Sequence, residues 1–320
     1  MGRFLVAVLV LMLATVSATA GEKASAAKSE PPKPGVEVVD ESFKAVVAPD
    51  AEVRQLAKDL KFTEGPTWYA AEKCVLFSDI PADTIYKWSE ADGLKAWRQP
   101  SHNANGNAVD PQGRLVSCEH SARCITRTGK DGKVETLCST YKGKKLSSPN
   151  DVIVKSDGTV WFTDPPYGIP KGEQKEQDKN RVYRLDPGAK EPVAAVEDFD
   201  MPNGLAFSPD EKVLYIADSG KPRHIRRFTV KPDNTLEGGD VFVKISPGGP
   251  DGIRCDKAGR LFSSAGDGVQ VFSPEGKLIG KVRTPQGAAN LCFGGPDGKT
   301  LFITARTGFW AVNLLTPGAK

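Results

Sequence analysis

The sequence is constrained most by a unit that recurs six times after residue 60. Each unit places an Asn or acidic residue, usually beside Gly or Pro, ahead of a short apolar run, a turn and a second apolar run. These polar residues, called marker residues below, are spaced about 40 to 50 residues apart, which is the length of one four-stranded propeller blade. They are Glu64, Asn105, Asn150, Asn203, Asp251 and Asn290.

The repeat predicts an all-β fold, a six-bladed β-propeller. Short Val, Ile, Leu and Phe runs recur between Gly, Pro and Asp, and no long apolar period of 3.6 residues is sustained. The last unit ends after its third strand, at 309–312, so we expect the run 53–57 to supply the fourth strand and close the ring. A β-sandwich, the competing fold, gives no reason for six such periods.

The marker residues point to a metal site. The first strand of every propeller blade lines the central channel, so residues at one repeat position converge on its axis. All six markers carry side-chain oxygen. Oxygen ligands of this kind favour Ca²⁺, with Mg²⁺ or Mn²⁺ possible, and Zn²⁺ is less natural without His or Cys. The alternative is that these residues only form turns, but this explains Glu64 and Asp251 less well.

Five motifs together resemble the gluconolactonase/regucalcin (SMP-30-like) family across about residues 55 to 315. They are Phe62–Pro66, Ser148–Val152, Phe162–Gly168, Met201–Leu205 and Gly249–Ile253. The resemblance implies that one catalytic divalent cation is bound by Glu64, Asn150, Asn203 and Asp251. It also implies that Asp251 acts as the base.

The resulting functional hypothesis is metal-dependent hydrolysis of an aldono-lactone such as gluconolactone. One alternative keeps the metal and changes the substrate to another lactone or a phosphotriester. A second alternative is a propeller that binds calcium or a ligand without catalysis. No Gly-x-Ser-x-Gly or Walker-type loop supports serine hydrolase or nucleotide chemistry.

Three further residues are candidates for substrate binding: Asn105, Glu119 and His120. Asn105 is a marker residue, although Asn107 occupies a position that is apolar in other repeats. Glu119 and His120 follow a second strand, whose end should lie at the site entrance. Asp79 and Asp164 end equivalent strands, and we expect them to cap turns instead.

The N-terminus predicts export. Residues 1–20 combine Arg3, an apolar run and Ala18-Thr19-Ala20, which is typical of a signal peptide cleaved near Ala20. Residues 21–42 are rich in Lys, Ala, Ser and Pro and predict a disordered tether. The hydrolase domain then spans 43–320, and we expect a secreted or periplasmic protein. The net charge of +3 is spread along the chain and gives no indication of nucleic-acid or membrane-surface binding.

Six cysteines in an exported chain leave disulfides open. Cys118, Cys124 and Cys138 flank two turns at matching distances, which predicts a single cross-strand row in which at most one bond can form. A domain of this size does not require a disulfide to fold.

Overall fold

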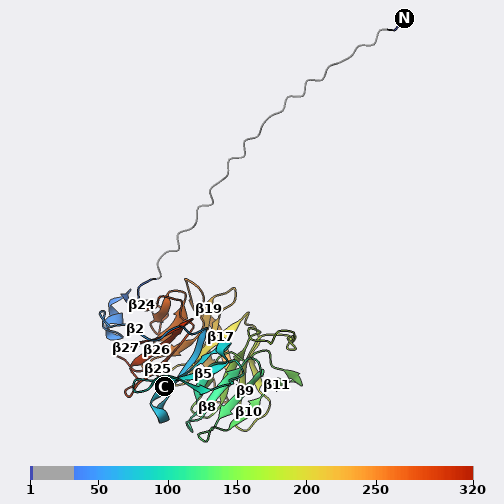
Figure 1. Cartoon of the computed structure of the whole chain (residues 1–320), viewed down its shortest axis with the longest axis horizontal. Helices are drawn as coiled ribbons and strands as arrows, with labels where there is room; N and C mark the ends of the chain where they lie inside the picture. Colours follow the sequence, from blue (N-terminus) through green and yellow to red (C-terminus); the bar gives the residue numbers. More distant parts are fainter. Residues whose placement is uncertain (3–31, 320) are drawn as a thin grey trace. The chain divides into compact units, whose positions relative to one another are not determined.

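The computed structural model describes residues 1–2 and 32–319, in which antiparallel sheets follow one another along the chain (Figure 1). Residues 3–20 of the predicted signal peptide and 21–31 of the predicted tether lie outside this part. Among the described residues, no helix combines the length and apolarity that a membrane crossing requires.

Six larger sheets form the fold, of which five have four strands and one has five. Their strands follow the order of the sequence except for two, which are added from near the N-terminus. The first three contain β3 (Thr63–Tyr69), β4 (Cys74–Asp79), β5 (Thr84–Ser89) and β6 (Gly93–Arg98); β7 (Ala104–Val109), β8 (Leu115–Glu119), β9 (Cys124–Thr128) and β10 (Val134–Cys138); β13 (Val152–Val154), β14 (Val160–Asp164), β15 (Arg181–Leu185) and β16 (Val193–Val196). A small hairpin of β11 (Thr140–Tyr141) and β12 (Lys144–Lys145) precedes the third.

The last three sheets repeat the pattern. They contain β17 (Pro202–Phe207), β18 (Val213–Asp218), β19 (His224–Val230) and β20 (Leu236–Lys244); β21 (Ile253–Cys255), β22 (Leu261–Ala265), β23 (Gly268–Phe272) and β24 (Leu278–Arg283); β25 (Asn290–Gly294), β26 (Thr300–Ala305) and β27 (Gly308–Asn313). The first strands of successive sheets are neighbours, from β3 through β7, β13, β17, β21 and β25 back to β3. This closed order is a six-bladed β-propeller, as the repeat predicted.

Packing between blades explains why the second strands are almost entirely buried. Each blade packs against a neighbour on both faces, so alternation between polar and apolar residues is lost. Every residue of β4 and of β14 is buried. Phe77 of β4 stacks on Phe309 of β27 with ring centroids 4.4 Å apart, which joins the first and last blades.

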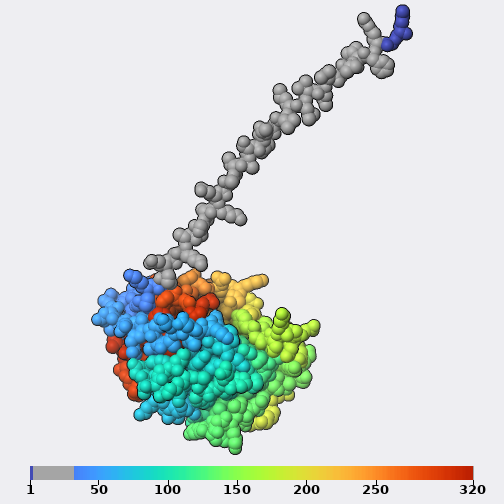
Figure 2. All heavy atoms as spheres, viewed as in Figure 1, coloured from blue at the N-terminus to red at the C-terminus, as the bar shows by residue number. Residues whose placement is uncertain are grey.

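The sixth blade is completed from the other end of the chain. Strand β2 (Arg54–Ala57) pairs antiparallel with β27, with Arg54 opposite Ala311 and Gln55 opposite Trp310. The N-terminal segment, drawn blue, therefore lies beside the C-terminal segment, drawn red (Figure 2). β2 becomes the outer strand of the sixth blade and covers the edge that β27 would otherwise expose.

The predicted tether is wrong over its last part. Strand β1 (Gly35–Val38) pairs with β24 and gives the fifth blade a fifth strand, and a 3-10 helix, η1 (Glu41–Ala45), follows. Val36 and Val38 pack on the core between the fifth and sixth blades, and Glu37 forms an ion pair with Arg283. Strand pairing, two valines and one carboxylate thus hold in place a segment whose composition predicts disorder.

All six cysteines are buried and free, and the predicted cysteine row does not form. Cys118 lies opposite Ile125, while Cys124 lies opposite Glu119. A β-bulge between Thr136 and Cys138 then shifts Cys138 opposite Ile125 as well. The extra residue of the bulge changes the register, which equal spacing about a turn does not reveal.

Candidate active site

The marker residues stand at one end of the innermost strands, where the backbone is shaped to direct them. β3, β7 and β17 each have a register irregularity at the marker, between Glu64 and Thr67, Ala104 and Asn107, and Pro202 and Leu205. Bulges of this kind re-aim a side chain. The second blade therefore has the same register irregularity as the first and fourth blades, and Asn105 takes its predicted place.

Glycines next to the markers bring adjacent blades into contact. The Gly106 N–H donates to the Asn150 main-chain oxygen at 2.8 Å, and the Gly204 N–H donates to that of Asp251 at 3.1 Å. A Cβ added at Gly204 would lie 2.2 Å from the Asp251 oxygen. Because only glycine permits this approach, the ring is narrow and its markers face one another.

The four predicted ligands share one buried site. Glu64, Asn150 and Asn203 are each no more than 4% exposed, and Asp251 is partly exposed. The Asp251 charge acts on Glu64, and the Asn203 side chain hydrogen-bonds to Asp251. Asn105 Nδ2 donates to Asn150 Oδ1, which ties the second and third blades to the same ring.

Asp151 and Arg254, which the sequence analysis missed, complete the charge pattern. Burial raises the pKa of Glu64, and the Asp251 charge raises it further. Burial also raises the pKa of Asp151 and brings that of Asp251 to about 7. Arg254 Nη1 lies 3.6 Å from Asp151 Oδ2. Neither Asp151 nor Arg254 is a marker residue. The two belong to different blades, so the repeat gives no sign that they pair.

This donor set fits a divalent cation. The carboxylates of Glu64, Asp151 and Asp251 face the guanidiniums of Arg254 and Arg306, so the ionised set has one excess negative charge, and charges removed from water require compensation. Asn105 Oδ1 and Asn203 Oδ1 are buried without a hydrogen-bond partner in the described residues, and such amide oxygens are ligands for hard cations. Within 32–319 no three His, Cys, Asp or Glu side chains form a metal-binding group, so the amides are essential to the set.

A cavity of about 170 Å³ adjoins Asp251, beside the ring of marker residues. Phe62, Ser219 and Arg306 line it, together with glycine-rich main chain from the fifth and sixth blades. The Arg306 charge acts to lower the pKa of Asp251, opposing the effect of burial. A polar molecule in this cavity would contact both the carboxyl of Asp251 and a guanidinium.

Tyr167 is a third residue that sequence reasoning did not assign. It lies just after β14, is 49% exposed, and its hydroxyl hydrogen-bonds to Ser219 and Asn203. Burial of the hydroxyl, with the nearby Asp251 charge, raises the pKa of Tyr167 to about 12. Its place in the motif Phe162–Gly168 was the available signal, but its partners lie in another blade.

Asn105 and His120 meet at the ring, whereas Glu119 does not. His120 Nε2 lies 3.3 Å from Asn105 Nδ2, and burial lowers the pKa of His120 to about 4, so the imidazole is neutral at pH 7. The Glu119 carboxylate instead accepts from Arg98 at 2.9 Å and from Thr126 at 2.7 Å. The predicted substrate contact from Glu119 is therefore wrong, because its carboxylate is already bound by Arg98, 21 residues away in sequence.

Asp79 and Asp164 cap backbone, as predicted. Asp79 accepts from the N–H groups of Lys61 and Phe62 at 2.9 and 3.1 Å, and Asp164 accepts from that of Ser147 at 2.8 Å. Asn107 is structural too, since its Nδ2 donates to the main-chain oxygen of Gly65 at 3.0 Å.

These features define a class: a six-bladed propeller with an oxygen-lined channel whose ring opens on a small polar cavity. Comparison with known proteins places the chain within that class. A profile of the SMP-30/gluconolactonase/LRE-like region matches residues 62–307. The chain belongs to this family.

Individual relatives agree. A gluconolactonase of Zymomonas mobilis is 32% identical over 289 residues, covering 82% of this chain and 81% of the relative. A 6-deoxy-6-sulfogluconolactonase of Pseudomonas putida is 28% identical over 250 residues, covering 76% and 82%. The solved structure of a Xanthomonas campestris gluconolactonase superposes with a TM-score of 0.84 at 37% identity, covering 88% of this chain and 95% of that one.

Proposed function

We propose that the protein hydrolyses a sugar lactone of the gluconolactone type, using one divalent cation. The observation that carries this proposal is the position of Asp251, which belongs both to the oxygen-lined ring and to the wall of the 170 Å³ cavity. The names of the relatives from Zymomonas mobilis and Pseudomonas putida support the substrate class.

Glu64, Asn150, Asn203 and Asp251 would hold the cation, with Ca²⁺ favoured over Mg²⁺, Mn²⁺ or Zn²⁺ by the all-oxygen donor set. A cation bound there would polarise the lactone carbonyl and stabilise negative charge on its oxygen. Asn105 supports the set by holding Asn150. Tyr167 holds Asn203 through its hydroxyl.

Asp251 performs the proton transfer. Its carboxylate accepts a proton from water as the water oxygen bonds to the carbonyl carbon. The bond from that carbon to the ring oxygen then breaks, and the carboxyl returns the proton to the departing oxygen, giving the open hydroxy acid. Arg306 acts to lower the pKa of Asp251, which favours the ionised form, and neutral His120 orients Asn105.

A panel assay tests this proposal. We expect turnover of glucono-δ-lactone that a chelator abolishes and added Ca²⁺ restores. The panel includes an aromatic lactone and an organophosphate triester, and a preference for either would transfer the proposal to that substrate. Cation binding without turnover of any member would indicate a binding propeller. Full activity after exhaustive chelation would exclude a metal-dependent reaction.

We also propose that the protein is exported and that its signal peptide is cleaved near Ala20. The support is the order of Arg3, the apolar run and Ala18-Thr19-Ala20. N-terminal sequencing of the protein from its producing cells tests this. Met1 retained on a cytoplasmic protein would contradict it.

A further inference from the structure

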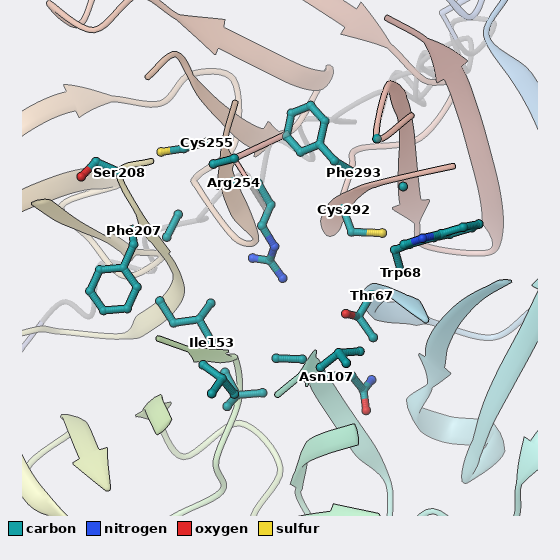
Figure 3. Close-up of a pocket in the computed structure, with 18 residues that line it drawn as sticks. Thr67, Trp68, Asn107, Ile153, Phe207, Ser208, Arg254, Cys255, Cys292 and Phe293 are labelled. Carbon is teal, nitrogen blue, oxygen red and sulfur yellow. The ribbon is translucent and has the colours of Figure 1, made fainter. Parts of the chain in front are cut away.

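The channel has a second cavity at its opposite end, and no step of the proposed reaction takes place there. It has a volume of about 250 Å³, and all six innermost strands contribute to its wall, with residues that follow the markers along each strand (Figure 3). Val154 and Ser208 of this wall are partly exposed, so the cavity opens to solvent. It is separate from the polar cavity beside Asp251, with which it shares no lining residue.

The wall is mostly apolar. Trp68, Val109, Ile153, Phe207 and Phe293 line it, its uncharged polar residues are Thr67, Asn107 and Ser208, and the lining contains no acidic side chain in the part of the chain described. The two lining thiols, Cys255 and Cys292, are uncharged because burial raises the pKa of each. The only charged side chain in the described lining is Arg254.

Arg254 extends into the middle of this cavity (Figure 3). Its Nη1 donates to the main-chain oxygen of Ile253 at 2.6 Å and lies 3.6 Å from Asp151. Within residues 32–319 this is its only ion pair, and it is longer than a charge-assisted hydrogen bond of about 2.7–2.9 Å. The remaining guanidinium donors are therefore available to an anion entering from the cavity.

We propose that this cavity binds a small organic anion, a carboxylate with an apolar body, whose carboxylate pairs with Arg254. The planar guanidinium fork matches a carboxylate, and the body would displace water from the apolar wall. Because Asp151 follows Asn150 in sequence and shares Arg254 with the cavity, the bound anion draws Arg254 from Asp151. Anion binding and cation binding at the ring therefore strengthen each other, by the same factor in both directions.

Benzoate is the probe, and binding is followed by calorimetry with the full chain, both with EDTA and with Ca²⁺. Chelation is essential because a cation at the ring would itself attract benzoate. We expect benzoate to bind in both conditions and benzamide, which has the same body without the charge, to bind at least about tenfold more weakly. Absence of benzoate binding up to about 10 mM would overturn the proposal.

Three variants locate the site. Arg254→Met should weaken benzoate binding at least about tenfold, and Val154→Phe should do so by filling the cavity with Arg254 in place. Arg260→Met is the matched control, because its guanidinium pairs with Asp256 in the same blade and does not line the cavity. Unchanged affinity in both cavity variants would overturn the site.

A calcium titration with and without benzoate tests the connection to the ring. The wild type should bind Ca²⁺ more tightly with benzoate present, and equal affinities would overturn the link through Arg254. This inference extends the proposed function without depending on turnover, since binding is measured directly. Loss of the lactonase proposal with retained benzoate binding would leave the cavity assignment intact.

Discussion

Gly65 approaches Asn105 so closely that an added Cβ would lie 2.0 Å from the main-chain oxygen of Asn105. Gly65 also has a φ of +52°, a conformation that side chains disfavour. Gly65→Ala should therefore lower the free energy of unfolding by at least about 3 kcal/mol. Gly143→Ala is the control, with a φ of +72° and open space, and should cost only about 1–2 kcal/mol. Equal losses in urea unfolding would show that the contact between blades does not matter.

Cation binding should stabilise the fold. Removing the ion leaves the carboxylates of Glu64, Asp151 and Asp251 with only the guanidiniums of Arg254 and Arg306 to balance them. Because the cation binds the folded ring, Ca²⁺ at 100 times its Kd should add about 2.7 kcal/mol. Glu64→Gln removes one charge at similar volume and should reduce the rise in thermal midpoint. Glu90→Gln, at a side chain 74% exposed, should behave as wild type. The proposed site is wrong if Glu64→Gln keeps the full calcium response.

Asp251→Asn should damage turnover far more than cation binding. An amide oxygen still coordinates a cation, as Asn150 and Asn203 are proposed to do, but it does not accept a proton at neutral pH. We expect kcat to fall by about 10²- to 10⁴-fold, measured at a Ca²⁺ concentration that saturates the variant. Bound calcium is quantified in the same samples, because losing one charge also weakens the site. Near-normal kcat with full occupancy would remove Asp251 as the base.

Tyr167→Phe should weaken cation binding although Tyr167 is not proposed as a ligand. The substitution removes the hydroxyl that holds Asn203 and Ser219, and partners that orient ligands typically contribute about 10- to 100-fold to metal affinity. Tyr86→Phe, in the outer part of the first blade, is the control. A calcium affinity equal to that of wild type would contradict a role for Tyr167 in orienting Asn203.

Asp164 should make stability depend on pH. Burial raises its pKa from 3.8 to about 7, so between these values the folded protein holds a proton that the unfolded chain has released. The contribution of Asp164 to stability is thus fully present below about pH 4 and is lost as pH rises to about 7. Asp164→Asn mimics the protonated form, and its stability relative to wild type should increase across this window by a few kcal/mol, on the order expected from the shift. Urea unfolding at several pH values checks this, and parallel curves would contradict it.

The architecture and the marker residues were predictable because each blade repeats the same short pattern, a polar residue followed by two apolar runs. A Glu, Asn or Asp at the start of an innermost strand reaches the axis whatever the rest of the blade contains, so Glu64 and Asp251 could be placed before any contact was known. The side-chain contacts between distant parts of the chain could not be predicted from the sequence. Arg254 pairs with Asp151, and Arg98 pairs with Glu119. Tyr167 forms a hydrogen bond with Asn203. The spacing of residues along the chain does not indicate any of these pairs.

Local irregularity accounts for the other differences. One bulge separates Cys138 from the predicted row, and strand β1 is only four residues long, too short for an alternating pattern to stand out from a Lys- and Pro-rich segment. Each is stabilised by partners distant in sequence, as Arg283 is for Glu37. Composition alone therefore indicates disorder where tertiary contacts produce order.

The pairing of β2 with β27 also bears on how the protein is made. A ribosome produces β2 early and β27 late, so the sixth blade has no complete set of strands while the chain is growing. Ring closure must await the release of the C-terminal strand. A chain that stays open until its synthesis ends can still enter a secretion channel that carries extended chains. The late pairing of β2 with β27 is therefore compatible with the proposed export.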